Sequence, residues 1–323
     1  MSNSPFPYES ADYEKVSCNF CGRDDSAPLH DRDRNGLNVQ SVICKHCGLI
    51  YISPRMTTAW YARYYDVEYR AQMARFKGKP LTPHDNAVLF KKASEHGRTL
   101  ATQVKEFWSQ GLTVEVGSSV GGVLNGIRQE IGVDVLGIEP SPDETGEANQ
   151  RGIKTHCASI ETFGEQIPPA ANILCSQSLN HFLSPRYFFE WSHRHLTDGG
   201  KLVLEVMNFR HVFRHFRWMQ RAIQVDHTYM FVPEVLEEFV THAGFKVLKL
   251  EVGEKLSSAE IKRLKKTAMP IFHILLVAEK TAKVPFSEPE KIPVLYKPVL
   301  ESIRTLPNSE FRFHLKKRFP KIF

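Results

Sequence analysis

The chain has 323 residues, of which 42% are hydrophobic and 24% are charged, as in an ordinary folded globular protein rather than a disordered one. This length favours one sizeable α/β domain with smaller appendages. The formal net charge of +6 is mild for the length, so it selects no anionic partner by itself. The first ten residues lack the basic and apolar regions of a signal peptide, and no apolar run is long enough to cross a bilayer. We therefore expect a cytoplasmic protein whose six cysteines are thiols or metal ligands.

Two CxxCG segments dominate residues 1–55, reading CNFCG at residues 18–22 and CKHCG at residues 44–48. A CxxC turn brings two thiolates to one face at a reach suited to tetrahedral zinc, and the glycine permits the tight turn. Four thiolates leave no open coordination position, so the predicted zinc is structural. The expected ligands are Cys18, Cys21, Cys44 and Cys47. The two remaining cysteines, Cys157 and Cys175, fall in or beside predicted strands and are expected to be small buried hydrophobes.

Residues 56–110 are predicted to form a helical linker or lid. Aromatic residues recur at helical spacing as far as Tyr69, which is typical of packing, although Tyr65 or Tyr69 could also face a substrate. The polar, basic stretch at residues 75–80 is expected to be a mobile lid or a plain linker. A helix should follow from about Pro83 to Gln110.

Residues 111–281 are predicted to form a Rossmann-like domain. A strand at residues 112–116 runs into the glycine turn GSSVGG, and the turn opens a helix. The next strand ends in Glu139, about 20 residues past the first glycine, as is typical of an acid that binds ribose hydroxyls. Further strands are expected near residues 153–156, from residue 171, and at residues 201–206, 246–252 and 271–279. Seven strands alternating with helices predict a doubly wound sheet whose last strand is antiparallel.

Three kinds of site compete for the glycine turn. A dinucleotide site needs glycine at the second position of GxGxxG, where this chain has Ser119. A hydrolase elbow matches the GxSxG pattern at residues 117–121, but that elbow normally follows several earlier strands. A site for S-adenosylmethionine (SAM) matches Glu115, Gly117 and Gly121 of the pattern ExGxGxG, with the middle glycine changed. The succession of strands and helices downstream favours the SAM site.

At these residues the chain resembles the class I SAM-dependent methyltransferases, and within them a bacterial group with an N-terminal CxxC…CxxC zinc-binding segment. The motifs that carry the resemblance are CGLIYISPR (47–55), YYDVEY (64–69), LNHFLSP (179–185), LTDGGKL (196–202) and DHTYMF (226–231). Three residues depart from the pattern: Ser119 for glycine, Asn172 for an aspartate that commonly opens the fourth strand, and Asn180 for the glutamate before His181. The resemblance implies SAM and structural zinc as cofactors and a sugar as the substrate class.

Methyl transfer from a sulfonium needs an aligned nucleophile that loses a proton, a task suited to neutral histidine. The resemblance implies that His227 is the base, with Asp226 able to orient it, while His181 and Tyr69 are further catalytic candidates. The turn should hold the methionine part of SAM, Glu139 its ribose, and residues 159–160 its adenine. The expected cofactor residues are Glu115, Gly117, Ser118, Ser119, Gly121, Glu139, Pro140, Ser159, Ile160 and Gln177. Metal-assisted transfer is not expected, because the end of the fourth strand has no acidic ligand.

Four functions remain open at this point. The first is methylation of a sugar hydroxyl, in a nucleotide sugar or a cell-surface glycan, and the second is C-methylation of a keto-deoxysugar. An RNA methyltransferase is disfavoured, because no basic stripe with stacking aromatics is apparent and nucleic acid is not an expected partner. An inactive interaction module is the fourth. The basic extension at residues 282–323 could contact a membrane surface or pack on the core, and the oligomeric state is left open.

Overall fold

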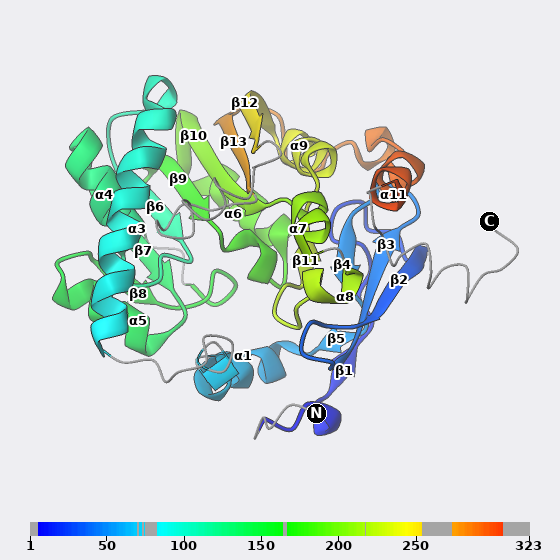
Figure 1. The fold of residues 1–323 in the computed structure, drawn as a ribbon. Coiled ribbons are helices and arrows are strands. Elements are labelled where there is room, and N and C mark those ends of the chain that lie inside the picture. The colour runs from blue at the N-terminus through cyan, green and yellow to red at the C-terminus, as the bar shows by residue number, and fades with distance from the viewer. Residues whose placement is uncertain are drawn as a thin grey trace, which may run out of the picture.

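A large α/β unit and a smaller β-rich unit pack side by side in the computed structural model (Figure 1). The structure describes residues 6–69, 71–72, 74, 83–163, 167–216, 218–253 and 273–305. Within these ranges, no helix combines the length and apolar character needed to cross a membrane. The basic stretch at residues 75–80 and the aromatic and basic end of the chain from residue 306 lie outside the described residues.

The α/β unit contains a seven-stranded sheet with the strand order β12-β13-β10-β9-β6-β7-β8. Its strands are β6 (Thr113–Val116), β7 (Val135–Glu139), β8 (Thr155–Cys157), β9 (Ala170–Ser176), β10 (Leu196–Met207), β12 (Phe245–Val252) and β13 (His273–Lys280). The first five are parallel to one another, whereas β13 is antiparallel to both β10 and β12. The centre of the sheet is mostly apolar and buried on both faces, as in other parallel sheets. The prediction of a doubly wound, seven-stranded Rossmann-like sheet is therefore confirmed.

Helices cover both faces of this sheet (Figure 1). One side carries α3 (Pro83–Gln103), α4 (Gly122–Ile131) and α5 (Pro142–Gln150), and the other carries α6 (Pro185–His195) and α9 (Pro233–His242). Helices α7 (Phe209–Phe216) and α8 (Met219–Ala222) pack on each other beside the β-rich unit. Helices α3 and α4 cross closely, since a Cβ on Gly126 would lie 2.2 Å from the carbonyl oxygen of Ser94. Helix α3 ends at Gln103, short of the predicted Gln110, and the chain continues through a 3-10 turn at Lys105–Phe107 to Ser109, whose backbone binds the Asn172 side chain.

The β-rich unit is built around a four-stranded antiparallel sheet with the order β11-β4-β3-β2. Its strands are β2 (Ser26–Arg32), β3 (Asn38–Cys44), β4 (Ile50–Ile52) and β11 (Tyr229–Met230), while β1 (Tyr13–Glu14) pairs with β5 (Arg55–Met56). Strand β11 comes from the DHTYMF segment, far along the chain. The N-terminal sheet is therefore completed by a strand from the part of the chain that lies between β10 and β12 of the α/β unit.

The C-terminal part of the described chain packs on the second cysteine knuckle. Helix α11 (Tyr296–Arg304) begins where the amides of Leu295 and Tyr296 donate to the carbonyl of His46. The imidazole Nε2 of His46 lies 3.0 Å from the carbonyl oxygen of Ile292. His46 therefore holds the C-terminal segment against the knuckle.

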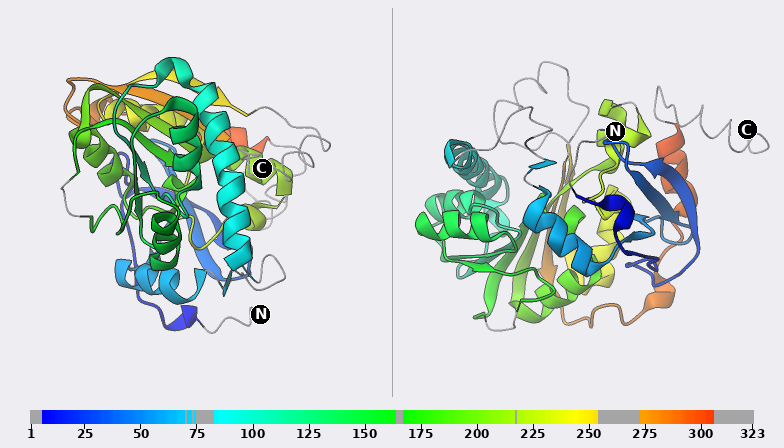
Figure 2. Two further views of the ribbon diagram at one scale, coloured as in Figure 1. Left: turned by 90° about the vertical axis from the view of Figure 1, so that its left-hand side faces the viewer. Right: turned by 90° about the horizontal axis from the view of Figure 1, so that it is seen from below.

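Helix α1 (Thr58–Val67) links the two units. Seen from below in Figure 2 (right), α1 lies across the carboxyl edge of the central sheet. Its Tyr61 and Tyr64 are buried, and the Tyr61 hydroxyl donates to the carbonyl of Val225 at 2.8 Å. The aromatic segment after the second CxxC knuckle is thus brought to the edge where the parallel strands end.

Candidate functional site

The glycine turn after β6 has the tight shape that the sequence predicts. Gly117 and Gly121 have φ values of 77° and 75°, and Ser119 also adopts a left-handed φ of 48°. A Cβ on Gly117 would lie 2.5 Å from the Ser178 side chain, whose hydroxyl donates to the Gly117 carbonyl. Only glycine fits at position 117. Ser119 adopts the left-handed backbone conformation that a glycine would adopt in its place, at some cost in strain. The replacement of the middle glycine therefore leaves the shape of the turn intact.

Glu139, at the end of β7, is held by this turn and by its own strand end. Its carboxylate accepts hydrogen bonds from the amides of Ser119 and Ser141, both at 2.9 Å. Burial and the neighbouring Glu144 raise the pKa of Glu139 to about 7, although these two amides oppose the shift. Pro140 follows at an exposed position. Each carboxylate oxygen keeps a second lone pair, so Glu139 can accept from a ribose hydroxyl.

Two further polar groups are buried beneath the turn. Glu115 is 1% exposed, and burial, together with the charges of Glu139 and Glu205, raises its pKa well above the usual range. Among the described residues, Glu115 Oε2 and the Ser118 hydroxyl have no hydrogen-bond partner. Buried polar atoms are almost always satisfied, so these two are candidates to bind a polar group of a ligand.

The remaining predicted cofactor residues follow β8 and β9. Gln177 has a left-handed φ of 60°, and its amide donates to the carbonyl of Glu205 at 2.7 Å. Ser159 is half-buried and exchanges hydrogen bonds with Thr162 in a short turn, while Ile160 is buried in the core. Because β6, β7, β8 and β9 are parallel, all the predicted cofactor residues lie at or beneath one edge of the sheet.

The predicted catalytic residues meet beside this edge. His181 ends a short 3-10 turn after β9, and its Nδ1 lies 3.6 Å from Asp226 Oδ2 and 3.3 Å from the Tyr65 hydroxyl. The His227 ring approaches His181 edge-on, with ring centroids 4.6 Å apart. One ligand-type atom from each of His181, Asp226 and His227 lies within 4.8 Å of the others. We call these three residues the His–Asp–His cluster. Tyr69 packs against the same imidazole of His181.

The turn that carries Asp226 and His227 is fixed from two sides. The His227 amide donates to Gln224, and Tyr61 binds the carbonyl of the intervening Val225. The Thr228 hydroxyl donates to the carbonyl of Phe182, and the side-chain amide of Asn180 donates to the carbonyl of Tyr229. An ionised glutamate at position 180 could not make that last bond, because it has no proton to donate. Asn180 therefore anchors the 3-10 turn that ends in His181 to β11.

The protonation states of the buried groups follow from their surroundings. Burial, followed by the charges of His181 and Arg34, lowers the pKa of His227 well below its usual value. Burial, followed by the charge of Asp226, raises the pKa of both Tyr65 and Tyr69, and Glu139 adds to this shift in each case. At neutral pH His227 is neutral and both phenols keep their protons. The phenols of Tyr65 and Tyr69 therefore lie within electrostatic reach of Glu139, the acid predicted to bind ribose.

Arg34 is a residue that sequence reasoning missed. It lies in the loop between β2 and β3, where the buried carboxylate of Asp33 accepts from the amides of Asn35 and Leu37 and shapes the turn. The Arg34 amide donates to Ile223, just before the Asp226 turn, and its charge acts on both His227 and Tyr69. The sequence DRNG at residues 33–36 indicates a turn between the two knuckles, which was the available signal. Only the tertiary structure shows that this turn places Arg34 near the His–Asp–His cluster.

Asn172 lies at the opposite, amino end of β9. It is fully buried, its oxygen accepts from the Ser109 amide, and its NH₂ donates to the Ser109 carbonyl and to Thr113 Oγ1. This position is remote from the edge that carries the glycine turn. The departure from aspartate at this position therefore concerns the packing of β6 and β9 rather than the cofactor.

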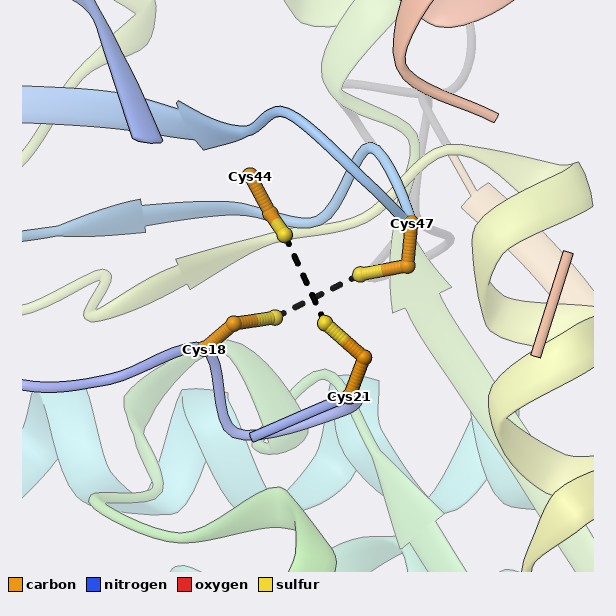
Figure 3. A group of neighbouring side chains, drawn as sticks. All are labelled: Cys18, Cys21, Cys44 and Cys47. Atoms are coloured by element: carbon orange, nitrogen blue, oxygen red, sulfur yellow. Dashed lines mark hydrogen bonds between the residues drawn. The ribbon is translucent and has the colours of Figure 1, made fainter. Parts of the chain in front are cut away.

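The four cysteines of the two knuckles converge (Figure 3). The Sγ atoms of Cys18 and Cys47 are 3.4 Å apart, those of Cys21 and Cys44 are 3.5 Å apart, and all four lie within 4.8 Å of one another. Cys175 is buried as predicted. Cys157 is exposed, so the prediction of a buried side chain was wrong there, because β8 is an edge strand and Cys157 is its last residue.

Residues 93–250, from within α3 to within β12, match the model of a methyltransferase domain. No curated protein matches the sequence. Similar solved structures include the plantazolicin methyltransferase BpumL in complex with a pentazolic desmethylPZN analog and SAH. The two chains are 14% identical with a TM-score of 0.49, and the alignment covers 68% of this chain and 95% of that one. A putative SAM-dependent methyltransferase from Listeria monocytogenes has 14% identity and a TM-score of 0.44, covering 58% and 99%. Magnesium protoporphyrin IX methyltransferase (ChlM) from Synechocystis PCC 6803, with bound SAM, has 12% identity and a TM-score of 0.44, covering 69% and 96%.

The matched segment contains the glycine turn, Glu139 and the His–Asp–His cluster. Residues 93–250 are therefore a methyltransferase domain, and the chain is a SAM-dependent methyltransferase.

Proposed function

We propose that this enzyme transfers the methyl group of SAM to a hydroxyl group of a sugar, either in a nucleotide sugar or in a glycan, without a metal ion in the chemical step. The observation that carries the proposal is the His–Asp–His cluster beside Tyr65, because a hydroxyl acceptor must lose a proton and these groups can take it. Neutral phenols at Tyr65 and Tyr69 combine a flat apolar face with a hydrogen-bond donor, which suits a sugar ring. The motif resemblance supports the same substrate class.

The cofactor side has a simple set of roles in this proposal. Backbone amides of the glycine turn and the polar atoms of Glu115 and Ser118 bind the methionine part of SAM, while Glu139 accepts from its ribose hydroxyls. The half-buried Ser159 and the neighbouring Ile160 flank the adenine. SAM brings its own activation as a sulfonium, so the protein mainly aligns the acceptor oxygen with the methyl carbon.

For the proton acceptor, the geometry favours His181 over His227, the residue that the resemblance favours. The Asp226 carboxylate lies 3.6 Å from His181 Nδ1, so it can orient that ring and stabilise the imidazolium that forms when Nε2 accepts the proton. Burial keeps His227 neutral, and the charge of Arg34 and that of His181 once it has taken the proton add to this effect. In this arrangement His227 is a hydrogen-bonding neighbour of the acceptor, and Asp226 is a positioning residue.

A panel of acceptors tests the proposal. Transfer of labelled methyl from SAM is measured with nucleotide sugars, methyl glycosides, a peptide and RNA, using the wild type and His181→Ala, with His195→Ala as a control on α6. We expect transfer to a sugar only, and a fall in kcat of about 10²–10⁴-fold in His181→Ala with unchanged SAM affinity. Full transfer by His181→Ala would rule out this base. Transfer to peptide or RNA but to no sugar would overturn the substrate class.

C-methylation of a keto sugar is the second candidate, favoured by one observation. Two imidazoles with ring centroids 4.6 Å apart provide two proton-transfer groups, one to remove the α-proton and one to hydrogen-bond the enolate oxygen. Incubating the enzyme with a keto sugar in D₂O separates the two reactions. Exchange of the α-hydrogen would indicate C-methylation, whereas a hydroxyl acceptor requires none.

We also propose that the four cysteines hold a structural zinc ion. Tetrahedral Zn–S bonds of about 2.3 Å place sulfurs about 3.8 Å apart, close to the 3.4 and 3.5 Å separations between paired Sγ atoms. The His46 amide also donates to Cys44 Sγ, as N–H groups do to metal thiolates. Four thiolates close the coordination sphere, so this ion would stabilise the N-terminal unit rather than take part in methyl transfer.

A further inference from the structure

The His–Asp–His cluster has a property that proton transfer does not use. Asp226 is 4% exposed, and its Oδ1 has no hydrogen-bond partner among the described residues, while Oδ2 faces His181. A buried carboxylate oxygen without a partner is costly unless a cation or donor binds it. The ligand-free protein therefore keeps an unsatisfied anionic oxygen beside two imidazoles.

The donor set and its spacing match those of a transition-metal site. Two imidazoles and one carboxylate are the ligands of many zinc, iron and related centres. Bonds of about 2.1 Å in tetrahedral geometry place ligand atoms about 3.4 Å apart, and the separation between His181 Nδ1 and Asp226 Oδ2 is 3.6 Å. The third ligand atom, on His227, lies within 4.8 Å of both, so a small rotation of that side chain completes the set.

From this geometry we infer that His181, Asp226 and His227 form a second metal site, separate from the cysteine site, which takes a divalent transition ion such as Zn²⁺ or Co²⁺. Its nitrogen and oxygen donors distinguish it from the four-thiolate site. Three protein ligands leave at least one position for water or an acceptor oxygen.

Occupation of this site inhibits methyl transfer, a consequence that rests on the function proposed above. The ion takes the Asp226 carboxylate and an imidazole lone pair, and it places positive charge where the imidazolium must form. The metal-free cluster is the active form, and the ion is a reversible inhibitor. Binding of the ion itself does not depend on the acceptor being a sugar.

The experiment uses the full chain with its cysteine site filled by zinc and SAH present. Co²⁺ is added and followed by visible absorption and calorimetry in the wild type, Asp226→Asn, His227→Ala and the control His195→Ala. We expect one further Co²⁺ per chain with d–d bands but no new thiolate charge-transfer band. Asp226→Asn, which preserves shape, and His227→Ala should each weaken this binding by at least about 10-fold, and His195→Ala should not.

Several results would overturn the inference. These are no uptake of Co²⁺ beyond the cysteine site, a new thiolate charge-transfer band, or wild-type affinity in Asp226→Asn. In the methyl-transfer assay, Zn²⁺ should inhibit the wild type and a chelator should reverse the effect. If Co²⁺ binds as expected but no sugar is methylated in the acceptor panel, the metal site stands and the proposed function fails.

Discussion

The cofactor side and the acceptor side of the enzyme are built in different ways. The groups proposed to bind SAM are mostly contributed by the chain between residues 115 and 141, where one strand, one turn and the next strand end place them. The proposed acceptor side combines Arg34, Tyr65, His181 and His227 from four separate segments. The first can form as soon as two neighbouring strands pair, whereas the second exists only when the N-terminal unit, α1 and β11 have docked.

This contrast predicts that the two sides can be damaged separately. A change in the N-terminal unit should remove methyl transfer while leaving SAM bound. A change at Glu139 should weaken SAM binding with the acceptor side intact, and a change at the amino edge of the sheet should affect stability alone.

The largest effect is expected from Cys18→Ser. Without four thiolates the proposed zinc is lost. The N-terminal sheet, which carries the Arg34 loop and includes β11, then becomes less ordered, so methyl transfer should fall by more than about 100-fold. After a weak chelator has emptied the proposed His–Asp–His site, metal analysis should return one zinc per chain for the wild type and less than half of that for the variant. Calorimetry should show SAM affinity within about 3-fold of wild type.

The matched control is Cys157→Ser, which changes an exposed thiol outside the knuckles and should keep both zinc and activity. Removing the zinc from the folded wild type with a strong chelator tests the same point without a mutation. Equal loss of SAM binding and methyl transfer would show that the two sides are not separable.

A smaller effect is expected at Glu139. Glu139→Gln should weaken SAM binding by about 10–100-fold, because it loses a charge-assisted hydrogen bond of about 1.5–3 kcal/mol. Since burial and Glu144 raise the pKa of Glu139 to about 7, the acid is protonated below that pH and must release a proton when it accepts from ribose. Wild-type SAM affinity should therefore fall as the pH drops from 8 to 6, and calorimetry in two buffers should detect the released proton.

Glu144→Gln refines this prediction. Removing the neighbouring charge lowers the pKa of Glu139, so the fall in SAM affinity should move to lower pH, while Glu139→Gln should show no such dependence. Identical pH profiles for wild type and Glu139→Gln would exclude Glu139 from the cofactor site.

The smallest effect on function is expected from Asn172→Asp, at the amino end of β9. An aspartate cannot donate to the Ser109 carbonyl and Thr113 Oγ1 as the Asn172 amide does, so unfolding should become easier by about 1–3 kcal/mol. Denaturant unfolding measures this change. SAM affinity and kcat should remain as in the wild type, and a 10-fold change in either would contradict the assignment of Asn172 to packing.

The sequence predicted what local rules determine. Glycine at 117 and 121, with an acid after the next strand, indicated the cofactor turn, and the alternation of apolar strands with helices indicated the sheet. Other features depended on long-range packing. The pairing of β11 with β4, the reach of Arg34 to the cluster and the contact of Asp226 with His181 join segments that no local pattern connects. The exposure of Cys157 was missed because edge position is a property of the whole sheet.

The junction of β11 and α11 with the N-terminal unit also bears on how the protein is made. During synthesis the four cysteines leave the ribosome first, yet β11, which pairs with β4, and α11, which packs on the second knuckle, are made much later. Until then the newly made N-terminal sheet has an unpaired edge on β4, a site at which nascent chains can associate with one another. Early metal capture would protect the thiols during this interval. We therefore expect zinc supply during translation to change the yield of soluble enzyme more than it changes the stability of the finished protein.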